Sequence, residues 1–202
     1  MRKVFTLLLK MRMATTRELN PQSFKMLWKT KGAMENIEPL LLVIVKEYRK
    51  KTWKKQEKVT WKDIADRVFS EYVRLYYADD YGYVKCITSG VTLFWKDSQC
   101  WHFVSRWVLK YRYDIMNCHP QSYAENVMLS GNYKVYTLQM IKMYWIDQVE
   151  YMVNDKGTWS YNQKEYEDMI IDWYKFIVEK KKIIEENQER TARLVENWTT
   201  RE

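Results

Sequence analysis

Apolar side chains recur at helical spacing along much of this sequence. The segment over residues 38–51 repeats them at steps of three and four, at Leu41, Ile44, Val45 and Tyr48. Such spacing predicts an amphipathic helix with one buried face. Pro39 suits the first turn of that helix, where its missing N–H would have no intrahelical partner in any case. The segment therefore predicts the first helix of a mainly α protein.

Two further segments show the same period. A second helix is predicted to begin at Thr60, because Thr60 and Asp63 have the spacing of a capping box, with Asp in place of the usual Glu. Its apolar face is formed by Trp61, Ile64, Ala65, Val68 and Tyr72. A third helix is expected from Ser98 to about residue 116, ending before Pro120. Its buried face would consist of Trp101, Val104, Val108, Tyr111 and Ile115.

The stretch over 77–96 loses the helical period. Residues 83–88 and 91–95 have strand-like composition and are separated by Ser89 and Gly90, so they are expected to pair as a short hairpin or to form a long ordered loop.

The C-terminal region predicts two more helices, over 133–153 and 162–198, separated by a polar break at 154–157. The last helix carries a heptad seam whose interacting residues are Ile170, Trp173, Ile177 and Ile184. The seam is expected to form either a helical hairpin with 133–153, through Leu138, Ile141, Trp145 and Val149, or a coiled coil with a second copy or a protein partner. We favour the intramolecular arrangement, because Lys180 and Asn187 interrupt the seam.

Composition agrees with a folded, mainly α chain. The 202 residues include ten Trp and sixteen Tyr but only five Gly and three Pro, which argues against disorder and against turn-rich β folds. We divide the chain into a basic N-terminal appendage over 1–35, a helical domain over 36–120 and a helical interaction region over 121–202.

The net charge of +8 is concentrated near the N-terminus, where residues 1–60 hold fifteen Lys and Arg against five acidic residues. This asymmetry favours a polyanionic partner, nucleic acid before a membrane surface. The basic residues at 49–51, with Lys54 and Lys55, also fit a nuclear import pattern. Three cysteines make no disulfide framework, which predicts an intracellular protein. No apolar run reaches the roughly 18 residues that span a bilayer, so no membrane partner is expected.

The three central helices resemble Myb/SANT-like DNA-binding domains of the MADF and trihelix type, over about residues 40–116. The resemblance rests on 41–45, on 60–65, and on a ladder of Cys100, Trp107, Val108 or Leu109, and Tyr111 or Tyr113. The sequence departs from the family in lacking a Trp at the start of the first helix and in the long 77–96 insertion. The implied fold is a three-helix bundle with an inserted loop or hairpin.

The resemblance implies that the third helix enters the major groove of duplex DNA. Helical spacing then defines its reading face as Gln99, His102, Arg106, Lys110 and Tyr113. Arg106 would bond guanine and Gln99 adenine. Phosphates would be contacted by Lys54, Lys55, Lys62 and Arg67. The chain is thus predicted to be a DNA-binding protein, such as a transcriptional regulator.

Two alternatives remain open. One is a helical adaptor of a virus or mobile element that binds protein through exposed aromatics and contacts no nucleic acid. The other is single-stranded nucleic-acid binding, with bases stacked on Tyr76, Tyr77, Tyr81 and Tyr83.

Metal binding and catalysis find little support in the sequence. Cys100, His102, Cys118 and His119 are good zinc ligands, but their spacing is unlike that of common zinc modules, so we expect no metal and no cofactor. Only two histidines are present, and the carboxylate pairs at 79–80 and 185–186 are too close in sequence to converge on a substrate. We therefore expect no enzymatic activity.

Overall fold

The protein is described by a computed structural model over residues 37–50, 59–155 and 157–199, and residues 38–202 form one compact unit. The appendage at 1–35 and the basic residues Lys54 and Lys55 lie outside the described residues. Helix α3 spans Ile37–Lys50 and α4 spans Trp61–Tyr76, which confirms the first two predicted helices. The mainly α class is also confirmed. None of the helices in the described part combines the length and apolarity needed to cross a bilayer.

A capping box starts α4, as the sequence predicts. The Asp63 amide donates to Thr60 Oγ1 at 3.2 Å, and the Thr60 amide donates to Asp63 Oδ2 at 2.9 Å. The box gives the Thr60 amide a side-chain acceptor and gives the Asp63 amide a second acceptor beside the Thr60 carbonyl, to which it donates at 3.1 Å. The shorter Asp side chain therefore replaces the usual Glu in this role.

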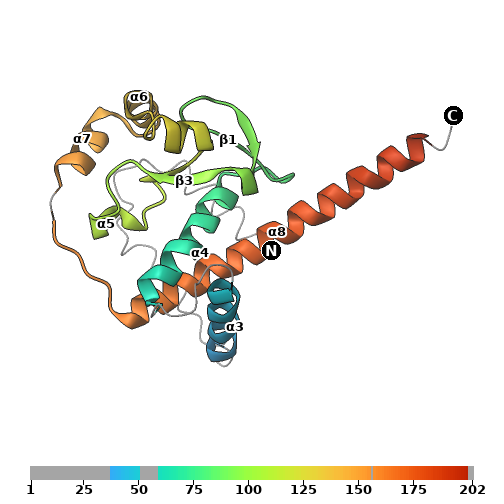
Figure 1. Ribbon diagram of the computed structural model, residues 1–202, viewed down its shortest axis with the longest axis horizontal. Coiled ribbons are helices and arrows are strands. Elements are labelled where there is room, and N and C mark those ends of the chain that lie inside the picture. Colours follow the sequence, from blue (N-terminus) through green and yellow to red (C-terminus); the bar gives the residue numbers. More distant parts are fainter. Residues whose placement is uncertain (1–36, 51–58, 156, 200–202) are drawn as a thin grey trace. The chain divides into compact units, whose positions relative to one another are not determined.

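Helix α8, Gln163–Thr199, lies along α4 (Figure 1). Ile170, Ile177 and Ile184 are buried, and the ring of Trp173 lies 4.9 Å from that of Phe69 on α4. The predicted seam is therefore covered within the chain. Its predicted partner, however, is wrong: α4 covers it, while Leu138 of the 133–153 segment is exposed.

Helix α3 joins the same helical layer through polar contacts. The Tyr48 hydroxyl donates to Glu71 Oε2 on α4 at 2.7 Å, and the Tyr174 hydroxyl on α8 donates to Glu47 at 2.9 Å. Ile44 is fully buried. Burial alone would raise the pKa of Glu71, but hydrogen bonds from Lys181 and Tyr48 lower this pKa below its usual value.

A two-stranded hairpin follows α4, so the hairpin expectation for 77–96 is confirmed. Strands β1, Tyr83–Lys85, and β2, Thr92–Phe94, are antiparallel, and a short 3₁₀ turn, η2, covers Trp95–Asp97. Gly82 before β1 has φ +90°, and a Cβ there would lie 2.6 Å from the Phe94 ring, so no larger residue fits. Asp80, just before the hairpin, accepts from Lys180 of α8 at 2.7 Å.

The third predicted helix, over 98–116, is wrong. Residues Gln99–His102 form strand β3, which pairs antiparallel with β4, Cys118–Gln121, and only Leu109–Arg112 form a short helix, α5. Backbone pairing with residues further along the chain overrides the helical spacing, because β3 gains a hydrogen-bonded partner strand. The three-helix bundle is therefore not confirmed. The predicted division at residue 120 falls inside β4.

The segment predicted as one helix over 133–153 is also divided. After a π-helical turn, η3, at Ala124–Met128, helices α6, Tyr133–Tyr144, and α7, Ile146–Asn154, meet at Trp145, which has φ +65° and ψ 154°. The break redirects α7, so that residues on both helices reach one core. That core contains Phe103, Tyr111, Tyr136, Met140, Val149 and Met152.

Candidate nucleic-acid interface

Strands β3 and β4 are joined by a loop over residues 103–117, which Asn117 holds closed. Asn117 is fully buried. Its Oδ1 accepts from the Val104 amide at 2.6 Å, and its Nδ2 donates to the carbonyls of Val104 and Tyr111, both at 2.9 Å. One side chain thus satisfies three backbone groups inside the loop. The loop therefore has a fixed shape before any ligand binds.

Arg112 attaches this loop to α4. Its Nε donates to Asp66 Oδ1 at 2.7 Å and its Nη2 to Asp66 Oδ2 at 2.5 Å, a bidentate pair, while its Nη1 donates to the Arg106 carbonyl at 2.5 Å. Tyr113 also donates to Asp66, at 2.9 Å. Burial alone would lower the pKa of Arg112, but the bonds to Asp66 raise this pKa above its usual value. The charge of the Asp66 carboxylate is therefore balanced by that of Arg112.

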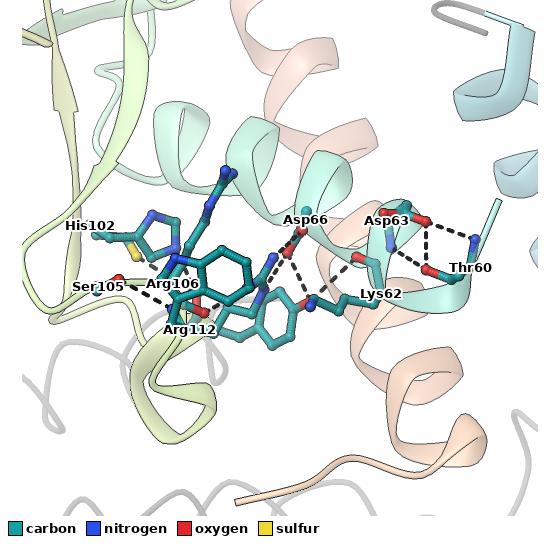
Figure 2. A network of polar contacts seen from close by, with 11 residues as sticks. Thr60, Lys62, Asp63, Asp66, His102, Ser105, Arg106 and Arg112 are labelled. Atoms are coloured by element: carbon teal, nitrogen blue, oxygen red, sulfur yellow. Dashed lines mark hydrogen bonds and ion pairs between the residues drawn. The ribbon is translucent and has the colours of Figure 1, made fainter. Parts of the chain in front are cut away.

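The outer side of the same loop is basic and aromatic. Trp107 is 79% exposed, and the ammonium of Lys62, in the first turn of α4, lies 5.8 Å from its ring centroid. Arg106 is exposed beside it in the chain. Figure 2 shows Lys62 and Arg106 on the two sides of the Arg112–Asp66 pair. We call Lys62, Arg106 and Trp107 the loop surface.

The other four residues of the predicted reading face form contacts within the protein. His102 Nε2 lies 3.0 Å from the Arg112 carbonyl, and burial lowers its pKa. Gln99 accepts from Asn126. Lys110 forms an ion pair with Asp155, and Tyr113 packs beside Phe69 and Trp173. Because no helix forms over 98–102, the five residues do not share one helical face.

Among the predicted phosphate contacts, Lys62 belongs to the loop surface, and Arg67 donates to the Tyr48 carbonyl at 3.0 Å. Trp107 was not among the predicted contacts, because the Myb/SANT-like resemblance assigns it to the ladder of core residues in the third helix. The two consecutive polar residues Ser105 and Arg106, directly before Trp107, are the sequence feature that could have indicated an exposed loop here.

Strand pairing also assembles a cluster that sequence spacing did not favour. The donor atoms of Cys100, His102 and Cys118 all lie within 4.8 Å of one another. His119, the fourth candidate, lies elsewhere: its ring nitrogens are 2.9 Å from the Tyr136 hydroxyl and 3.0 Å from that of Tyr144. Burial lowers the pKa of His119 to about 3.

The protein is mainly α, and hydrogen bonds of Asn117 and Arg112 hold a loop whose outer side is basic and aromatic. Residues 44–186 match the family described as bacteriophage lambda NinG protein. The match extends from α3 into α8 and includes the whole 103–117 loop, so the chain belongs to the NinG family. Comparison with curated proteins and with solved structures finds no match. A bacteriophage family gives no support to the predicted nuclear location.

Proposed function

We propose that this protein binds duplex DNA through the loop surface. The observation that carries the proposal is Trp107, an indole exposed over most of its area beside the cations Lys62 and Arg106. Tryptophan is enriched at binding interfaces, where its large ring supplies contact area. Lysine and arginine neutralise phosphates and release counterions, which supplies most of the non-specific affinity for DNA. This surface therefore offers both charge and apolar contact area.

The hydrogen bonds of Arg112 and Asn117 behind the loop surface also favour binding of a polyanion. The carboxylates of Asp66 and Asp155 lie beside the loop, and each is paired with a loop cation, Arg112 and Lys110 respectively, so both add little repulsion. Asn117 keeps the loop closed. A preformed loop loses less conformational entropy when it binds. The net charge of +8 adds long-range attraction to DNA.

The test is fluorescence anisotropy of a labelled random-sequence duplex at two salt concentrations. Arg106→Gln and Lys62→Gln should each weaken binding and reduce the slope of log K against log salt by about 0.9, the value for one phosphate contact. Lys142→Gln, at an exposed position on α6, is the matched control. If all three variants bind alike at both salt concentrations, the loop surface does not contact DNA.

Competition with an unlabelled single strand of the same length tests the alternative nucleic acid. Base stacking on Trp107 would contribute about 1–3 kcal/mol to single-strand binding. A duplex that competes better than the strand supports the proposal. A single strand that competes better, and loses its advantage in Trp107→Ala, would replace duplex DNA with single strands as the ligand.

A second function, binding of a protein partner, is favoured by a different surface. Trp145, at the break between α6 and α7, is 75% exposed and has a positive φ that is strained for a bulky residue. Leu138 and Ile146 are exposed on the same two helices. A partner that co-purifies with the wild type and with Trp107→Ala, but not with Trp145→Ala, would establish this adaptor role.

A further inference from the structure

The base of the 103–117 loop brings three metal-binding side chains together. His102 at the end of β3 is paired directly with Cys118 at the start of β4. Cys100 is two residues before His102, so both side chains project from the same face of β3. The three donor atoms lie within 4.8 Å of one another, and Cys118 is fully buried. The register of one hairpin therefore determines the whole cluster.

The donor types and their separation suit zinc. Two thiolates and one imidazole are preferred zinc ligands, with bonds of about 2.3 Å to sulfur and 2.0–2.1 Å to nitrogen. A tetrahedron with these bonds separates its ligand atoms by roughly 3.3–3.8 Å. Side-chain rotations that move the donor atoms closer by about 1 Å would give that spacing. Cys100 and His102 are only half-buried, which leaves solvent access for a water in the fourth position.

The surroundings of His102 orient the ring as a ligand. Its Nε2 lies 3.0 Å from the Arg112 carbonyl oxygen. A carbonyl only accepts hydrogen bonds, so this contact assigns the proton to Nε2 and the lone pair to Nδ1. Histidines that bind metals usually donate their other ring N–H to a carbonyl or carboxylate in this way. Arg112 is also the residue that attaches the loop to α4 through Asp66.

We propose that Cys100, His102 and Cys118 bind one Zn²⁺ ion at the base of the 103–117 loop. The ion would join β3 to β4 at the point where the loop begins and ends. It would thus add a second clamp to the one that Asn117 provides. The site is independent of the proposed function, because its occupancy can be measured without DNA.

The first test is metal binding by the full-length protein. The protein is purified without chelators, its zinc content is measured by mass spectrometry, and the metal-free form is titrated with Co²⁺ under reducing conditions. We expect one equivalent of zinc and a thiolate-to-Co²⁺ charge-transfer band with the intense visible bands of tetrahedral cobalt. A wild-type protein that carries no zinc and gives no charge-transfer band would overturn the proposal.

Substitutions then assign the ligands. Cys100→Ser and Cys118→Ser should each weaken or remove the charge-transfer band, and His102→Gln should weaken Co²⁺ binding, because an amide can keep the bond to the Arg112 carbonyl but lacks the imidazole lone pair. Cys86→Ser is the matched control, since Cys86 is a buried thiol outside the cluster whose Thr88 contact a hydroxyl can keep. An equal loss in Cys86→Ser would contradict the assignment.

A thiol count separates metal binding from a disulfide. Denatured, unreduced protein should give three reactive thiols after chelation, as the three free cysteines require. A count of one, restored to three by reductant, would indicate a bond between Cys100 and Cys118 and would overturn the proposal. Neither result depends on whether a substituted protein folds.

Discussion

The α4–α8 pair and the β3–β4 hairpin are ordered by different kinds of interaction. Along α4 and α8, apolar side chains such as Phe69, Trp173 and Ile177 repeat on facing sides and bury one another. In the hairpin, Phe103 and Tyr111 anchor the 15-residue loop in the core with α6 and α7, and two polar residues, Asn117 and Arg112, set its shape through hydrogen bonds to its backbone and to Asp66. Apolar packing spreads stability over many contacts, whereas a buried polar residue concentrates it in a few bonds.

The largest effect is expected from a charge placed between the two helices. Ile177→Lys should destabilise the protein by more than about 4 kcal/mol, because a buried ammonium would have no partner in the α4–α8 contact. Urea denaturation measures the loss. Val178→Lys, one residue further on the exposed side of α8, should change stability by less than about 0.5 kcal/mol.

Light scattering adds a second measurement to this substitution. Because α4 already covers the seam, wild type and Ile177→Lys should have the same subunit number under native conditions. A dimeric wild type that becomes a folded monomer on substitution would show that a second copy, rather than α4, covers Ile177.

The next largest effect is expected at Asn117, whose side chain holds the 103–117 loop closed. Asn117→Ala should cost roughly 3 kcal/mol, because it leaves the Val104 amide and two backbone carbonyls without their buried partner. Hydrogen exchange should show the loss concentrated in residues 103–117, with the α4 amides changed less. Asn154→Ala, at an exposed position on α7, is the control. Uniformly faster exchange across both regions would mean that the loop and the helices unfold as one unit.

The same comparison explains what could be predicted from sequence. Helices α3, α4 and most of α8 were predicted because their caps and apolar period lie within a few consecutive residues. Strand β3 was not, because its identity depends on residues 118–121, which lie beyond the loop. The cluster of Cys100, His102 and Cys118 was discounted for the same reason: a spacing in sequence cannot show a register between strands. The partner of α8 also depends on tertiary packing.

A smaller, pH-dependent effect is expected at Glu71, where α3, α4 and α8 meet. Lys181 donates to Glu71 at 2.5 Å and Tyr48 at 2.7 Å. These bonds keep the folded-state pKa of Glu71 below its unfolded value. The folded state therefore binds fewer protons, so the stabilisation is present above about pH 4.5 and is lost as the pH falls through the folded pKa.

Glu71→Gln should thus cost about 1–3 kcal/mol at neutral pH, the range for hydrogen bonds to a charged group. The difference from wild type should shrink as the pH is lowered below about 4.5. Urea denaturation at a series of pH values measures it. Glu179→Gln, exposed on α8, should follow the wild-type pH dependence. A constant difference between wild type and Glu71→Gln at every pH would show that packing, not charge, explains the cost.

The smallest effect on stability is expected at Trp107, although tryptophan is the largest side chain in the protein. Removing a buried tryptophan typically costs about 3–5 kcal/mol. Trp107 is 79% exposed on the loop surface, so Trp107→Ala should change the free energy of unfolding by less than about 0.5 kcal/mol while weakening DNA binding. Urea denaturation and anisotropy on the same preparation measure the two effects. A loss of several kcal/mol in stability would place the indole in the core. Unchanged DNA affinity in the same variant would remove Trp107 from the interface.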